Sequence, residues 1–183
     1  MSNWRQSTLT NLSMTKPHHI LRPVSALFIS VSLICAFLLN LLPWGNFWAV
    51  PDWVALALVF WNTHQPRKVG IGIAFAMGLA MDVDHAVLMG EHALAYTILS
   101  YGAIALHRRV LWFPMSGQMA HVFPLLLGAQ LVTMLVRMAV GANFPGVEHL
   151  LQSVVAALLW PVASWILLAP QRRPIERDVT RPL

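Results

Sequence analysis

Long apolar runs alternate with short polar stretches along most of the chain. Each run is close to the roughly 20 residues that a helix needs to cross about 30 Å of hydrocarbon. The pattern therefore predicts an all-α integral membrane protein. Its six transmembrane helices are expected over residues 23–42, 47–63, 69–88, 92–111, 118–140 and 150–169.

Proline and glycine refine these predicted helices. Pro51 and Asp52 stand near the start of the second helix, where proline is tolerated and the helix dipole favours an acid. Pro124 falls inside the fifth helix and predicts a kink, and Pro161 falls inside the sixth. The short turn around Gly90 predicts that the third and fourth helices are antiparallel neighbours.

The cations sort to one side of such a bundle. Cytoplasmic loops carry an excess of Lys and Arg, and the connections 43–51, 88–91 and 141–149 contain neither. Both termini are therefore predicted to be cytoplasmic. A merely re-entrant second segment would break this sorting, which favours a full span. Eleven of the twelve Lys and Arg residues lie in the segments predicted to be cytoplasmic: Arg5, Lys16, Arg22, Arg67, Lys68, Arg108, Arg109, Arg172, Arg173, Arg177 and Arg181.

Composition agrees with a membrane protein, because 57% of the residues are hydrophobic and 10% are charged, against about 25% charged in soluble domains. The predicted organisation is a basic cytoplasmic tail (1–22), a six-helix transmembrane domain (23–169) and a second basic cytoplasmic tail (170–183). The net charge of +5 indicates contact with anionic membrane lipid. Nucleic-acid binding is not expected, since the cations are scattered singly or in pairs.

Small residues recur every four positions in the third predicted helix. Gly70, Ala74, Gly78 and Asp82 share one helical face, and small residues let a neighbouring helix approach closely in lipid. Two interpretations follow. The face packs inside the bundle, or it is a binding face for a partner chain or for a second copy in a homodimer.

Four charged residues are candidates for polar contacts within the membrane: Asp52, Asp82, Asp84 and Arg137. A charge in the bilayer is costly and needs a partner, a proton or water. Arg137, in the fifth predicted helix, is the obvious partner for Asp82 or Asp84. The alternative is that each side chain reaches the outer headgroups separately.

No chemistry of catalysis or metal binding is predicted. Asp82, Asp84, His85, Glu91 and His92 resemble a metal-ligand cluster in composition, but their spacing matches no framework of known geometry. The sequence has no nucleophile elbow and no phosphate-binding glycine loop. We therefore expect neither an enzyme nor a cofactor.

Short motifs spread over several predicted helices occur in a characteristic order and spacing, and they are densest from 51 to 101. They are Pro51–Asp52–Trp53, Trp61, Pro66, Val69–Gly70, Gly72, Gly78–Leu79, Asp82, Gly90, Ala93–Leu94, Tyr101 and Trp160–Pro161. Taken together, these motifs resemble the MreD family of bacterial rod shape-determining membrane proteins, and the resemblance covers most of the chain. Asp84 and His85 are more polar than the family pattern at that place.

The resemblance implies a non-enzymatic scaffold, multi-pass in the bacterial cytoplasmic (inner) membrane. Such proteins help to maintain cell shape within the machinery that elongates the peptidoglycan cell wall. Their partners are the bitopic protein MreC, the MreB filament, the glycosyltransferase RodA and a class B transpeptidase. The resemblance also implies a fold similar to the substrate-binding subunits of energy-coupling-factor (ECF) vitamin transporters.

A small-molecule-binding subunit of an ECF-like vitamin transporter is the competing interpretation. Acidic and histidine side chains would form a polar outer rim around a pocket open to the outside. The rim would consist of Asp52, Asp82, Glu91, His92 and Glu148.

Overall fold

The computed structural model describes residues 24–44, 50–142, 146 and 148–172. The predicted tail 1–22 and residues 173–183 of the second tail lie outside this part. Six α helices and a final 3₁₀ turn make up the described chain, which contains no β strand. They are α2 (Ala26–Leu41), α3 (Trp53–His64), α4 (Ile71–Asp84), α5 (Glu91–Trp112), α6 (Met115–Ala139), α7 (Glu148–Leu168) and η2 (Ala169–Arg172).

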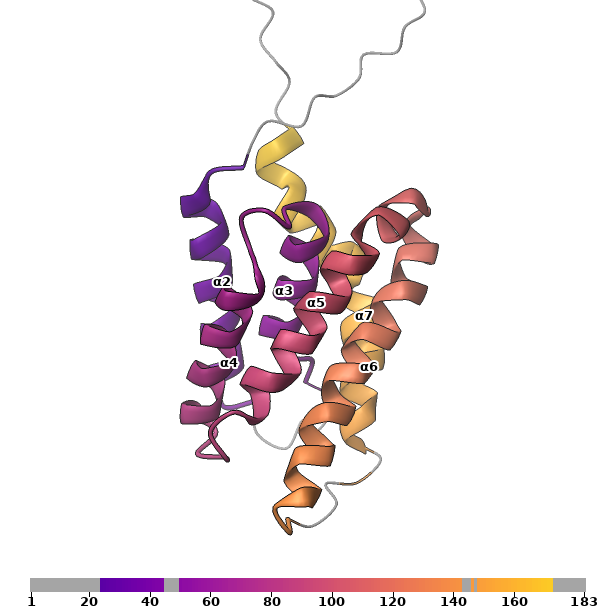
Figure 1. Cartoon of the computed structure of the whole chain (residues 1–183). Helices are drawn as coiled ribbons and strands as arrows, with labels where there is room; N and C mark the ends of the chain where they lie inside the picture. The colour runs from indigo at the N-terminus through magenta and orange to yellow at the C-terminus, as the bar shows by residue number, and fades with distance from the viewer. Residues whose placement is uncertain (1–23, 45–49, 143–145, 147, 173–183) are drawn as a thin grey trace, which may run out of the picture.

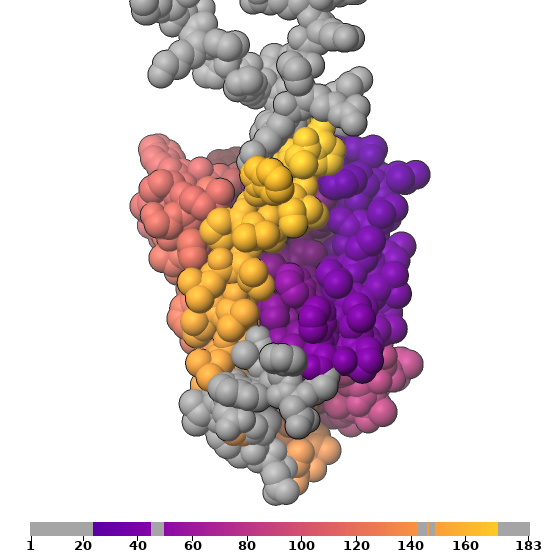
Figure 2. Space-filling model, turned by 180° about the vertical axis from the view of Figure 1, so that it is seen from behind, coloured from indigo at the N-terminus to yellow at the C-terminus, as the bar shows by residue number. Residues whose placement is uncertain are grey.

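The helices run alternately up and down in one bundle (Figure 1). The predicted antiparallel pairing across Gly90 is confirmed, because α4 and α5 are neighbours in extensive contact. α5 contacts α3, α4 and α6, while α7 packs against α6 and α3. Figure 2 shows α7, in orange and yellow, running across one face of this arrangement.

The core of the bundle is built around α3. This helix contacts α2, α5, α6 and α7, and every residue from Val54 to Thr63 is buried. Its aromatic side chains Phe60 and Trp61 pack edge to face, with ring centroids 5.0 Å apart. A helix that is apolar on all sides is expected at such a central position.

Three helices are shorter than the sequence predicts. α3 begins at Trp53 instead of residue 47, and α4 ends at Asp84 instead of residue 88. At about 1.5 Å per residue, the 12 residues of α3 and the 14 residues of α4 span less than the hydrocarbon core. Two helical stretches in the described chain, Met115–Ala139 and His149–Gln171, are long and apolar enough to cross a membrane. α2 is apolar but has only 16 residues.

Charge divides the two ends of the bundle. Arg67 and Lys68 lie between α3 and α4, and Arg108 and Arg109 lie in the last turns of α5. We call this the basic end. The opposite end, where α2, α4 and α6 finish and α3, α5 and α7 begin, is the acidic end. It carries Asp52, Asp82, Asp84, Glu91 and, as an exception in sign, Arg137.

Large apolar side chains cover much of the outer surface. Leu27 is 73% exposed on α2, Leu135 64% on α6, and Leu158 62% on α7. A soluble monomer rarely exposes apolar surface this widely, because contiguous apolar patches are sites of protein or membrane contact. The outer surface is therefore suited to lipid.

The small-residue face of α4 lies inside the bundle. Ala74 is fully buried, and a Cβ atom built on Gly78 would lie 2.3 Å from the Cα atom of Ala93 in α5. The interpretation that this face binds a partner or a second copy is therefore wrong for Ala74 and Gly78, because α5 already covers them. Gly70 differs, since it is the N-cap of α4 and no atom lies within 4 Å of its Cβ position.

Substituting Gly78 should separate α4 from α5. We expect Gly78→Ala to destabilise the protein by about 1–3 kcal/mol, because backbone atoms of Ala93 would have to move. Gly72→Ala, on the same helix with no atom within 4 Å of its Cβ position, is the matched control and should melt at or above the temperature of the unsubstituted protein. Thermal unfolding in detergent, followed by circular dichroism, measures both. Equal melting temperatures for the two variants would contradict the close crossing.

Candidate functional site

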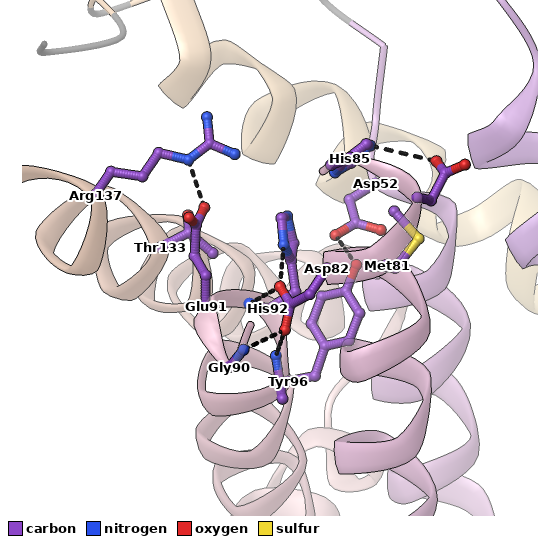
Figure 3. Close-up of polar contacts among 12 residues, drawn as sticks. Asp52, Met81, Asp82, His85, Gly90, Glu91, His92, Tyr96, Thr133 and Arg137 are labelled. Carbon is purple, nitrogen blue, oxygen red and sulfur yellow. Dashed lines mark hydrogen bonds and ion pairs between the residues drawn. The ribbon is translucent and has the colours of Figure 1, made fainter. Parts of the chain in front are cut away.

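Polar side chains gather at the acidic end and connect five helices. We call this group the polar cluster (Figure 3). Its residues come from the ends of α2, α4 and α6 and from the starts of α3 and α5. The members are Asn40, Asp52, Asp82, Glu91, His92, Tyr96 and Arg137.

Asp52 is the N-cap residue of α3 and is held by side chains from two other helices. Its Oδ1 atom accepts hydrogen bonds from the Ala55 amide at 3.0 Å and from Asn40 Nδ2 at 2.9 Å. Its Oδ2 atom accepts from the Tyr96 hydroxyl at 2.6 Å, and Asn40 Oδ1 accepts from the Trp53 amide at 3.0 Å. Asp52 is thus an N-cap whose charge is stabilised by α2, α5 and the positive end of the α3 dipole.

Asp82 caps a different helix from the one that carries it. From the last turn of α4 it accepts hydrogen bonds from the amides of Gly90 at 2.8 Å, His92 at 2.7 Å and Ala93 at 3.4 Å. These are donors that the start of α5 cannot satisfy within the helix. The His92 ring adds a contact, with Nδ1 2.9 Å from Asp82 Oδ1. Asp82 is only 2% exposed, so four donors replace the water that its carboxylate gives up.

Two glycines make this capping possible. Gly78 lies one helical turn before Asp82 and lets α4 approach α5. Gly90 has a φ of 108°, a left-handed conformation that glycine adopts without steric cost. It turns the chain so that its own amide faces Asp82. The small residues of α4 thus bring the helix close to α5, and this approach lets Asp82 reach the first amides of α5.

Arg137 pairs with Glu91, not with an aspartate. Its Nε donates a hydrogen bond to Glu91 Oε1, and Glu91 is only 1% exposed. The hypothesis of an Asp82–Arg137 or Asp84–Arg137 pair is therefore wrong. Asp82 is directed at the start of α5, and Asp84 is exposed, with its nearest cation-capable group at His85 Nε2, 3.9 Å away. Glu91, the first residue of α5, faces α6 instead.

His85 follows α4 in the connection to α5. Partial burial and the neighbouring His92 imidazole lower the pKa of His85 below its ordinary value, although the Asp84 carboxylate opposes the shift. The imidazole is therefore mainly neutral at pH 7.

A cavity of about 520 Å³ opens beside the polar cluster. Asp52 and His92 of the predicted outer rim line it, but Asp82 and Glu91 do not, because their carboxylates point into the helix packing. The side chain of Glu148 lies outside the described part. Among the described residues, no group of three or more His, Cys, Asp or Glu side chains could hold a metal ion.

Sequence reasoning missed the uncharged members of this site. Gln130 Nε2 donates to Gln152 Oε1 at 3.0 Å, and the Ser153 hydroxyl donates to Gln130 Oε1, which links α6 to α7 along the cavity wall. Asn40 and Tyr96 hold Asp52. The available signal was the presence of amide side chains inside otherwise apolar runs, since buried amides require partners.

Comparison with known proteins gives a consistent result. Residues 21–171 match the family model described as rod shape-determining protein MreD. The chain is also 31% identical over 152 residues to a protein of Haemophilus influenzae named rod shape-determining protein MreD. That alignment covers 80% of this chain and 88% of the relative. No solved structure matches the chain significantly.

Removing the Asp82 carboxylate should loosen the start of α5. We expect Asp82→Ala to cost about 2 kcal/mol or more, because three backbone amides lose their acceptor. The matched control is Asp84→Ala, at an exposed position, which should change stability by no more than about 0.5 kcal/mol. Thermal unfolding reports the loss, and hydrogen exchange of the 90–93 amides should accelerate only in Asp82→Ala. Unchanged exchange there would contradict the capping.

The Glu91–Arg137 pair should be energetically coupled. Arg137→Gln leaves a buried carboxylate without its cation, a change that typically costs about 3–5 kcal/mol. The double variant Glu91→Gln with Arg137→Gln should be more stable than the sum of the single effects by at least about 1 kcal/mol. Asp84→Ala combined with Arg137→Gln is the control cycle and should be additive. Additive effects for Glu91 and Arg137 would contradict the assignment.

Proposed function

This chain belongs to the MreD family of rod shape-determining proteins, and we propose that it is a non-enzymatic scaffold of the bacterial cell-elongation complex. In this role it links an MreC-like bitopic protein, the MreB filament and the peptidoglycan synthases, RodA and its transpeptidase. The family match carries the proposal, because it spans the whole described bundle. The same match places the chain among membrane proteins that determine rod shape.

The proposed topology is six spans in the cytoplasmic membrane, with the basic end toward the cytosol. The distribution of cations supports it, since Arg67, Lys68, Arg108 and Arg109 lie at one end of the bundle. The short α3 is compatible with it because α2, α5, α6 and α7 surround this helix. Its ends then face protein and the polar cluster instead of lipid.

Partner contacts in this proposal use the outer faces of the helices. The Ala74–Gly78 face is occupied by α5, so a partner helix or a second copy has to bind elsewhere. α2 offers an apolar row at helical spacing, with Leu27, Val31, Ile34 and Leu38 all exposed. In lipid, such a row associates with another helix through van der Waals packing.

The native cysteine supports a direct test of that contact. Cys35 lies on α2 and is exposed, and a bifunctional reagent anchored there would reach a helix packed on this side. Cross-linking of the purified complex should join Cys35 to the MreC-like partner, and Cys35→Ser should abolish the product.

The function is tested in a rod-shaped host depleted of its own family member. Expression of this chain should keep cells rod-shaped and should co-purify the MreC-like protein, whereas depletion alone should give rounded cells. A variant that cannot close the α4–α5 crossing, Gly78→Leu, should fail in both respects. Gly72→Leu, at an exposed position of the same helix, is the control. Rounded cells despite full expression of the folded chain would overturn the proposal.

The transporter alternative receives no support from the comparisons, since both matches are to rod shape-determining proteins. It makes a different prediction for the same cells. A vitamin-binding subunit would leave shape intact on depletion and would reduce uptake of a small molecule.

A further inference from the structure

The cavity beside the polar cluster is not used by the proposed scaffold function. It lies at the acidic end and is bordered by side chains from α2 through α7. Its volume of about 520 Å³ falls within the range of about 300–1,000 Å³ that is typical of small-molecule sites. The cavity is therefore large enough for a ligand much larger than water.

The carboxylate and amide oxygens around the cavity are already engaged. Asp52 accepts from three donors, and Asp82, behind the wall, accepts from four. Gln130 Oε1 accepts from Ser153, and Gln152 Oε1 accepts from Gln130. A ligand therefore finds few acceptors for its own donors.

Donors remain available on the same walls. Within residues 24–44, 50–142, 146 and 148–172, the terminal nitrogens of Arg137 and the Nε2 of Gln152 make no hydrogen bond. Figure 3 shows both terminal nitrogens of Arg137 directed away from Glu91. The Nε contact with Glu91 fixes the guanidinium in place. Binding of an oxyanion therefore costs less side-chain entropy at Arg137 than it would at an unpaired arginine.

The charges around the cavity do not favour more than one negative charge on the ligand. Arg137 is the one Lys or Arg at the acidic end of the described chain, and the carboxylates of Glu91 and Asp52 already lie near it, so the surroundings do not compensate a dianion. The rest of the lining is partly apolar, with Leu126, Ala129 and Ala156 on α6 and α7. This wall suits a ligand body that avoids water.

We propose that this cavity binds a ligand with a singly charged oxyanion, a carboxylate or a phosphodiester, on Arg137 and Gln152. Its apolar body lies against Leu126, Ala129 and Ala156. The oxyanion comes from a phospholipid headgroup or from a soluble molecule, and both sources offer the same acceptor oxygens. The proposal is independent of the scaffold function and requires no transport.

Two pairs of probes separate the sources and test the charge. Dihexanoyl phosphatidylglycerol and neutral dihexanoylglycerol form the lipid pair, and N-acetylglycine and neutral N-acetylglycinamide form the soluble pair. Calorimetric titration of the full chain in non-ionic detergent measures each affinity. At least one anionic probe should bind at least about tenfold more tightly than its neutral analogue, as charge-assisted hydrogen bonds require.

Variants then locate the binding. Ala129→Leu fills the cavity and should weaken the anionic probe at least about tenfold. Ala120→Leu adds the same volume at an exposed position of the same helix and should bind like the unsubstituted chain. The double variant Glu91→Gln with Arg137→Gln keeps the net charge and avoids a buried unpaired acid. It should lose the preference for the anionic over the neutral probe.

Three results would overturn the proposal. One is equal binding of the anionic and neutral probes, and another is no saturable binding of either anionic probe at millimolar concentration. The third is equal affinity of Ala129→Leu and Ala120→Leu. If Ala129→Leu does not fold, Ala156→Leu on the opposite wall provides the same test.

Discussion

Backbone amides at the start of a helix need acceptors, and inside an apolar bundle water does not supply them. Two aspartates meet this requirement here. Asp52 caps α3, and Asp82 reaches across from α4 to cap α5. In return, the amides and the helix dipoles stabilise two carboxylates that would otherwise be costly to bury. The short α3, the close α4–α5 crossing and the direction of Glu91 all depend on this exchange.

The capping also explains why one cation is sufficient at the acidic end. Asp52 and Asp82 are satisfied by hydrogen bonds, so Arg137 is left for Glu91. Neighbouring helices are then joined by polar contacts that have defined geometry, which apolar packing alone lacks. These contacts fix the relative positions of the helices and therefore the outer surface that faces lipid. Among the described residues, the same arrangement leaves the terminal nitrogens of Arg137 and Nε2 of Gln152 without a hydrogen bond beside the cavity.

Particular residues show which features of the structure could be predicted from the sequence. The spacing of Ala74, Gly78 and Asp82 identified the face of α4 that packs against α5, although Gly70 of the same spacing lies apart from it. Asp52 was placed correctly at the start of a helix. The predicted partner of Arg137, Asp82 or Asp84, was wrong, because Arg137 pairs with Glu91. Glu91 is close to Asp82 and Asp84 along the chain, so counting residues could not distinguish them. The predicted helix lengths were wrong for a related reason. An apolar run does not reveal at which residue the helix is capped by a side chain from another helix.

By itself, the sequence determined the number and order of the helices within the described residues and the separation of charge between the two ends. These follow from apolar runs and the positions of Lys and Arg, which are properties of local segments. Only the tertiary structure decided that Asp82 caps α5, that Arg137 forms an ion pair with Glu91, and that Gln130 and Gln152 border a cavity. The physical reason is that a hydrogen bond requires atoms within about 3 Å of each other. Only the packing of helices distant in the chain sets such distances.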